Sequence, residues 1–172
     1  MICVEILNKI REPICPDKPL RYYKYKNENK QPQYSFVIDN GHISRKLSQF
    51  GVVQSKTFKL KFPKFLNKKL IRHFIRGYFD GDGCITKCET KTNHYKYNVS
   101  FVSTDKFLED LQRYFNSNLG IKINKLQNRH PERNNNIRTL SIGGNLQVEK
   151  LLNHLYDNST SFLQRKYDKY LK

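Results

Sequence analysis

The sequence predicts an α+β protein in which helices pack on antiparallel strands. Ile71, Ile75 and Phe79 recur at helical spacing and form one apolar stripe. Apolar and polar residues alternate over Tyr95–Ser103, as they do in a strand with one buried face. From residue 67 onward the expected order of elements is α-β-β-α-β-β-α, with an extra helix at the end.

Residues 1–66 give a shorter pattern, α-β-β-α. The elements expected there are a helix over residues 2–11, strands over 20–26 and 34–39, a helix over 43–50 and a basic extended linker over 56–64. Pro13 and Pro16 are expected to stop the first helix, because proline lacks the amide hydrogen that a helix interior needs. This order is the back half of the unit that follows, so we interpret residues 1–66 as a partial repeat. An unrelated N-terminal extension is the alternative.

Residues 67–172 are expected to form the complete domain. Its elements are a helix over Lys68–Phe79, strands over Cys84–Glu89 and Tyr95–Ser103, a helix over Lys106–Leu119, strands over Ile121–Leu126 and Asn136–Ile142, and helices over Leu146–Tyr156 and Phe162–Leu171. Gly120 follows the second of these helices, where a C-cap residue is expected. The two strand pairs are expected to form a four-stranded antiparallel sheet.

The charge of the chain points to a polyanionic partner. There are 32 Lys and Arg residues against 15 Asp and Glu, a net charge of +17 and a pI near 9.8. A nucleic acid is the first candidate for such a partner. A merely basic, well-solvated surface is the alternative, but here the cations are interleaved with 11 Tyr and 11 Phe residues.

Membrane and secreted classes are not indicated. No apolar run approaches the length of a membrane span, and the N-terminus lacks the basic start and cleavage site of a signal peptide. We therefore expect an intracellular protein. The four cysteines, Cys3, Cys15, Cys84 and Cys88, form no CxxC pair, so reduced thiols are expected, with a structural zinc site as the alternative.

The segment Ile75–Gly83 carries the most chemistry. Gly77 lies within the apolar helix, where a missing side chain would let another backbone approach closely. Gly81 and Gly83 are expected to break the helix around Asp82 and leave a carboxylate at the negative end of the helix, where a cation fits. An EF-hand loop starting at Asp80 is excluded, because its sixth position would be isoleucine and its twelfth lysine.

Ile75-Arg-Gly-Tyr-Phe-Asp-Gly-Asp-Gly83 resembles the motif of the LAGLIDADG homing endonucleases. It matches at the first glycine, both acids and the last glycine, and departs at Arg76, where the family usually has a small residue. The resemblance implies two such helices packed together, in one chain or across a homodimer, and a four-stranded saddle on double-stranded DNA. It also implies that Asp82, with the Gly81 carbonyl beside it, binds Mg²⁺ or Mn²⁺. Gly77 and Asp80 would then belong to the helix interface, Asp80 as the capping acid.

Two further catalytic candidates come from the same resemblance. Lys166 in the closing helix would reach the active site and help to stabilise charge, with Arg165 as the fallback. A solvated face of a basic helix is the alternative for Lys166. Asp105 follows a strand near the place where the family often has a polar residue close to the attacking water. Its alternative role is the N-cap of the helix beginning at Lys106.

Strand alternation predicts which side chains face DNA. Val99 and Phe101 should point toward the helices, and the polar residues between them should face the groove. The residues expected on the DNA face are Thr86, Cys88, Lys96, Asn98, Ser100, Lys122 and Asn124. Arg138 and Thr139 compete for the last strand, and the pattern does not decide between them.

The sequence therefore indicates a homing endonuclease that hydrolyses phosphodiester bonds of a long duplex with a divalent metal ion. Only one Gly-Asp-Gly motif is present, although a metal site of this kind needs a second facing acid. A non-catalytic or decayed DNA-binding protein of the same fold is the main alternative. An RNA-binding helper of intron splicing is the third.

Overall fold

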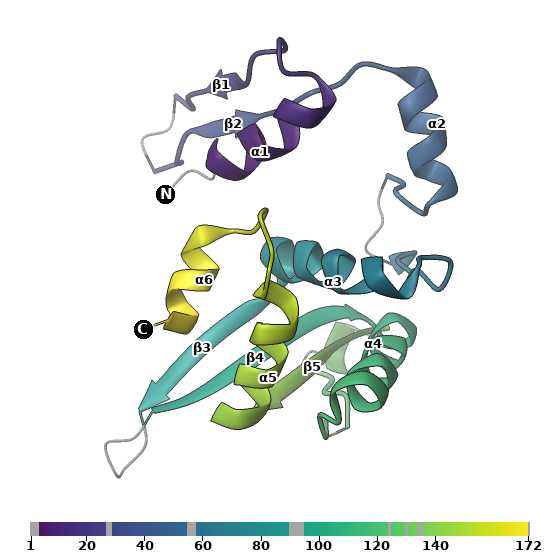
Figure 1. Ribbon diagram of the computed structural model, residues 1–172, viewed down its shortest axis with the longest axis vertical. Coiled ribbons are helices and arrows are strands. Elements are labelled where there is room, and N and C mark those ends of the chain that lie inside the picture. The colour runs from purple at the N-terminus through teal and green to yellow at the C-terminus, as the bar shows by residue number, and fades with distance from the viewer. Residues whose placement is uncertain are drawn as a thin grey trace.

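A three-stranded antiparallel sheet in the order β3-β4-β5 is the centre of the protein, with α3, α4 and α5 packed on it (Figure 1). The computed structural model describes residues 4–26, 29–54, 58–89, 95–123, 125–129, 131–133 and 136–171. The elements of this unit are α3 (Lys68–Asp82), β3 (Cys84–Glu89), β4 (Tyr95–Thr104), α4 (Asp105–Leu119), a short 3₁₀ turn at Pro131–Arg133, β5 (Ile137–Gly143), α5 (Asn145–Tyr156) and α6 (Gln164–Leu171). The expected α+β class is confirmed.

The expected strand alternation is also confirmed. Val99 lies between Ile85 of β3 and Ile142 of β5 in the strand register, and Phe101 lies opposite Leu140. All five side chains are buried, with at most 4% of their surface exposed. Since residues directly opposite each other share a face, one face of the sheet meets the helices and the other is left to solvent.

Helix α3 is longer than the sequence pattern predicted. It begins after the cap residue Asn67, whose side chain accepts a hydrogen bond from the amide of Lys69. Its turns continue past Phe79 to Asp82, and the amide of Gly83 closes the last turn on the Phe79 carbonyl at 2.9 Å. The expected end of the helix around Asp82 is therefore confirmed, and only the expected bound at Phe79 was three residues short. The helix passes through Gly81 because glycine weakens a helix but does not prevent hydrogen bonding through it.

The fourth strand expected over Ile121–Leu126 is not formed in the described residues. The only pairing found near it is a single antiparallel bridge between Gln127 and Thr139. Helix side chains satisfy the backbone of this segment instead, since Gln147 accepts from the Lys122 amide at 2.8 Å and Gln112 donates to the Ile123 carbonyl at 3.2 Å. A segment with these partners has less need of a neighbouring strand.

The first part of the chain contains α1 (Val4–Ile14), β1 (Arg21–Tyr23), β2 (Gln33–Ser35) and α2 (Gly41–Gln49). These elements follow the expected order, but both strands are shorter than predicted. Helix α1 runs one residue past Pro13 and ends before Pro16, and the Cys15 amide closes its last turn on the Arg11 carbonyl. In Figure 1, α3 lies between these elements and the sheet. None of the helices in the described ranges combines the length and apolar character needed to cross a membrane.

Candidate active site at the end of helix α3

Asp82 is the last residue of α3 and its side chain is exposed. Gly81 before it is also exposed, whereas Gly83 after it is buried against Phe79. The carboxylate therefore lies at the C-terminal end of a helix, where the terminal carbonyls give partial negative charge. Such a place favours a cation.

Lys166 of α6 binds the same helix end. Its ammonium group donates hydrogen bonds to the carbonyls of Phe79 and Gly83 and lies 4.9 Å from the centre of the Phe79 ring. The side chain is buried, with 5% of its surface exposed, so it is not part of a solvated face. Burial lowers the pKa of the Lys166 amine, and the nearby Asp80 carboxylate opposes that shift. The lysine thus places a positive charge beneath the helix terminus.

Asp80 turns toward the C-terminal part of the chain. Its Oδ1 accepts a hydrogen bond from the Tyr156 hydroxyl at 2.7 Å, and its Oδ2 accepts one from the Leu163 amide at 2.9 Å. Asp80 therefore fixes the connection that leads into α6. Burial and the Asp80 carboxylate both raise the pKa of Tyr156, so its hydroxyl stays a donor.

Arg76 holds the same connection from one turn earlier. Its Nε donates to the Ser161 carbonyl at 3.0 Å, and its Nη1 donates to the Leu155 carbonyl at 3.1 Å. Nη1 also lies 2.9 Å from Nδ1 of His73. Only 8% of the Arg76 surface is exposed. The unusual arginine in the motif therefore caps the C-terminal end of α5. These roles of Arg76 and Tyr156 were not predicted from the sequence, although the four-residue spacing of Arg76 and Asp80 places both on one helix face.

The side of α3 that carries Gly77 and Gly81 is open. A Cβ added at Gly77 or Gly81 would meet no heavy atom within 4 Å, and both glycines are exposed. Beside Gly77 lies a pocket of about 810 Å³, whose apolar lining includes Phe62, Phe65 and Phe74. Within the described residues, nothing approaches Gly77 in the way that the sequence predicted for a second helix.

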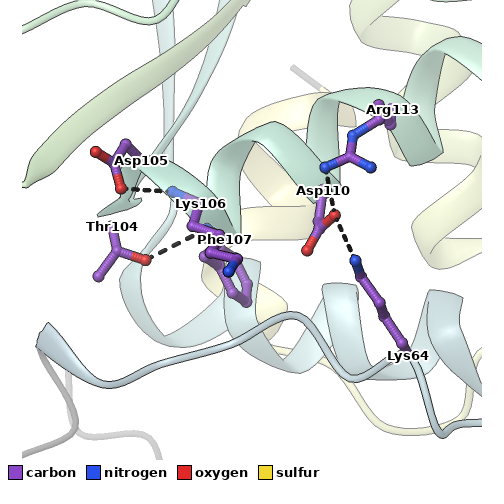
Figure 2. A network of polar contacts seen from close by, with 7 residues as sticks. All are labelled: Lys64, Thr104, Asp105, Lys106, Phe107, Asp110 and Arg113. Carbon is purple, nitrogen blue, oxygen red and sulfur yellow. Dashed lines mark hydrogen bonds and ion pairs between the residues drawn. The ribbon is translucent and has the colours of Figure 1, made fainter.

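Asp105 lies at the start of α4, where both its side chain and its amide make hydrogen bonds (Figure 2). Its Oδ1 accepts a hydrogen bond from the Lys106 amide at 2.7 Å, and its own amide donates to the Asn136 carbonyl at 2.8 Å. The N-cap of α4 is Thr104, whose hydroxyl accepts from the Phe107 amide, so the N-cap role considered for Asp105 was wrong by one residue. Further along the helix, Figure 2 shows Asp110 paired with Lys64 at 3.1 Å and Arg113 at 2.7 Å.

The solvent face of the sheet carries the hydrogen-bonding residues that strand alternation placed there. Thr86 lies opposite Asn98, Cys88 opposite Lys96, and Ser100 opposite Ser141. Lys122 is exposed, and Asn124 lies outside the described residues.

The register also settles the choice left open on the last strand. Thr139 lies opposite the exposed Val102 and therefore shares the solvent face, although only 3% of its own surface is exposed. Arg138 lies opposite the buried Ser103, on the face toward the helices.

The oxygen donors at the end of α3 suit a hard divalent cation but are few. Asp82 supplies one carboxylate, and the Gly81 carbonyl adjoins it in sequence. The described part of the chain contains no group of three or more His, Cys, Asp or Glu side chains that could hold a metal ion. Mg²⁺ is usually bound through one or two carboxylates together with water and phosphate, so Asp82 supplies the smallest number of carboxylates that such a site uses.

Comparison with protein families gives a match to the LAGLIDADG-like domain over residues 69–156. Among curated proteins, the chain is 37% identical over 79 residues to the DNA-directed RNA polymerase subunit Rpo1C of Methanocaldococcus jannaschii. That alignment covers 45% of this chain and 9% of the subunit, so the chain corresponds to a small part of that relative.

Solved structures give weaker similarities. The LAGLIDADG meganuclease I-AabMI bound to uncleaved DNA aligns with 58% of this chain and 33% of its own, at 18% identity and a TM-score of 0.42. The homing endonuclease I-TnaI aligns with 58% of this chain and 66% of its own, at 13% identity and a TM-score of 0.41. The homing endonuclease I-CvuI, in complex with its target in the presence of Ca, aligns with 51% of this chain and 55% of its own, at 15% identity and a TM-score of 0.37.

Proposed function

Since the chain belongs to the LAGLIDADG-like domain family, we propose that it is a homing endonuclease that binds a long DNA duplex and hydrolyses its phosphodiester bonds with a divalent metal ion. The observation that carries this proposal is the position of Asp82. The carboxylate is exposed at the end of α3, next to a helix face that Gly77 and Gly81 leave open. An acid in this place can meet both a substrate and a second acid.

The second acid would come from a second copy of the chain. Two α3 helices packed through their Gly77 faces would bring two Asp82 carboxylates together, because the open face leads to the helix end that carries the acid. Asp82 and the Gly81 carbonyl would hold Mg²⁺ or Mn²⁺, which when bound polarises the phosphate and lowers the pKa of a water ligand. This homodimer is part of the proposal.

The remaining residues have distinct roles in the proposed enzyme. The buried Lys166 ammonium lies beneath the helix terminus and offsets negative charge there. Thr86, Asn98 and Ser100 on the solvent face of the sheet can exchange hydrogen bonds with base edges in the major groove. The net charge of +17 favours the phosphate backbone, so affinity should fall steeply with salt.

The test begins with selection of bound duplexes from a randomised DNA library, because the target sequence is not needed for it. The selected duplexes are then incubated with Mg²⁺ and either the wild-type chain or Asp82→Asn. We expect cleavage by the wild type only, with similar duplex affinity for both, because the exposed carboxylate makes no contact that the fold requires. Equal cleavage by the variant would remove Asp82 from the mechanism.

A DNA-binding protein without catalysis is the second candidate function. The observation in its favour is that Asp82 belongs to no group of three or more His, Cys, Asp or Glu side chains among the described residues that could hold a metal ion. Light scattering separates the two candidates, because the enzyme needs a dimer of 20.5 kDa chains on its duplex. A complex that stays monomeric on DNA, and does not cleave it with Mg²⁺ or Mn²⁺, would support the binding protein.

A further inference from the structure

The hairpin formed by β1 and β2 has a composition that the proposed catalytic unit does not explain. It lies outside residues 69–156, which match the family. Residues 18–35 contain five cations, Lys18, Arg21, Lys24, Lys26 and Lys30, against one acid, Glu28. Four tyrosines alternate with these cations, at positions 22, 23, 25 and 34. Aromatic rings interleaved with positive charge in this way are typical of surfaces that bind nucleic acid.

The strand register divides these tyrosines between two faces. Tyr22 lies opposite Tyr34, and their ring centres are 4.9 Å apart. Tyr23 lies opposite Gln33 and therefore on the other face, where its ring meets Tyr25 edge-on at 4.9 Å. We call the second group, Arg21, Tyr23, Tyr25, Lys30 and Gln33, the Tyr23 face.

The Tyr23 face is arranged before any partner binds. The Tyr25 hydroxyl donates a hydrogen bond to Oε1 of Gln33, and the Lys30 ammonium lies 5.2 Å from the centre of the Tyr25 ring. Tyr23 stands against this fixed ring with 60% of its surface exposed. A large aromatic side chain that is held in place yet exposed offers a flat surface at a low cost in conformational entropy.

We propose that the Tyr23 face binds single-stranded DNA by stacking an unpaired base on the Tyr23 ring. Aromatic rings beside Lys and Arg are the usual means of holding an unpaired strand, because every base has a face that can stack. A duplex covers those base faces with neighbouring base pairs and is read by hydrogen bonds at base edges instead. The solvent face of β3 and β4 has hydrogen-bonding side chains of that second kind, so the two surfaces suit different forms of nucleic acid.

Charge supports the same assignment. Lys18 and Arg21 lie within 4 Å of Asp39, at 3.9 and 3.8 Å, but no acid among the described residues pairs with Lys24, Lys26 or Lys30. Phosphates of a strand passing over Tyr23 would meet these cations, which no described acid neutralises. The strand is taken to be DNA because the proposed endonuclease acts on a DNA duplex, and oligouridine provides the comparison with RNA.

The neighbouring tyrosine provides a matched control. Tyr22 is 53% exposed and adjacent in sequence, but it lies on the opposite face of the hairpin. The probe is a fluorescently labelled oligothymidine strand of about 12 nucleotides, a length within the range of single-strand-binding surfaces. Its affinity for the full chain is measured by polarisation for the wild type, Tyr23→Ala, Tyr23→Phe and Tyr22→Ala.

We expect Tyr23→Ala to weaken binding of the strand roughly tenfold, as the loss of one stacked base does. Tyr23→Phe should bind like the wild type, because the ring is kept, and Tyr22→Ala should change affinity little. Duplex affinity and any cleavage should be the same in Tyr23→Ala and the wild type, so failure of the proposed endonuclease activity would leave this test intact.

Four results would overturn the proposal. Unchanged affinity of Tyr23→Ala for oligothymidine would show that the ring does not stack. An equal loss in Tyr22→Ala would show that the effect does not belong to the Tyr23 face. Tighter binding of oligouridine than oligothymidine, or an equal loss of duplex affinity in Tyr23→Ala, would assign the surface to RNA or to duplex DNA.

Discussion

At the C-terminal end of α3, two alanine substitutions only two residues apart, Gly83→Ala and Gly81→Ala, are expected to have opposite effects on stability. Gly83 has a φ of −75°, which any residue adopts, so backbone conformation does not demand glycine there. The demand is steric. A Cβ at Gly83 would lie 2.2 Å from Cδ2 of Phe79 and 2.8 Å from its Cε2 and its carbonyl oxygen.

The Phe79 ring has little room to move away from such a Cβ. It is fully buried, and its centre lies 5.4 Å from that of Phe101 and 6.5 Å from that of Tyr156. Overpacking of a core costs roughly 1–3 kcal/mol, and we expect Gly83→Ala to fall near the upper end, at about 3 kcal/mol. For a chain of this size that corresponds to a fall in Tm of roughly 6–12 °C.

Gly81→Ala is the matched control for this prediction. No heavy atom lies within 4 Å of a Cβ at Gly81, and the position is helical, so alanine should be neutral or stabilise the helix by up to about 1 kcal/mol. Urea and thermal denaturation followed by circular dichroism measure both changes. A Gly83→Ala variant as stable as the wild type, or a Gly81→Ala variant that loses as much stability as Gly83→Ala, would contradict this steric account.

Two further predictions concern polar groups beneath the helices. Tyr156→Phe removes one hydrogen bond to the Asp80 carboxylate and should lower the free energy of unfolding by about 1.5–3 kcal/mol, measured in urea. No measurable loss would show that this bond does not stabilise the fold. The pKa of His154 is lowered, first by burial and then by Arg72, with Asp157 opposing, and its Nε2 lies 3.0 Å from the Tyr114 hydroxyl. The fold therefore favours neutral His154, so stability should be full above the unfolded pKa of about 6.5 and fall as the pH drops below it. His154→Gln should lose less stability than the wild type between neutral and acidic pH, and an equal loss in both would contradict this assignment.

The spacing of apolar residues along the chain predicted which faces of the central helix and strands are buried. The apolar stripe through Ile71, Ile75 and Phe79 is buried, and Val99 and Phe101 face the helices as alternation required. The family resemblance, read from nine residues, is confirmed by the match over residues 69–156. These features follow from the periods of helices and strands, which the sequence displays directly.

Features that depend on distant partners were missed. The segment after Gly120 looks like a strand, but Gln112 and Gln147 supply its hydrogen bonds from two helices. Asp80 finds its partners 76 and 83 residues further along the chain, at Tyr156 and Leu163. No local pattern indicates contacts at such separations, so the structural role of Asp80 could not be read from its neighbours in sequence.

The geometry of the helix explains why the motif carries two acids with different surroundings. Residues two apart on an α-helix point about 200° away from each other, so Asp80 and Asp82 cannot share a face. Asp80 faces α5 and the connection to α6, where Tyr156 and Leu163 bind both of its oxygens. Asp82 must then face outward, and its exposure agrees with that direction. The contacts that fix α6, and with it Lys166, thus leave the second acid available at the helix end.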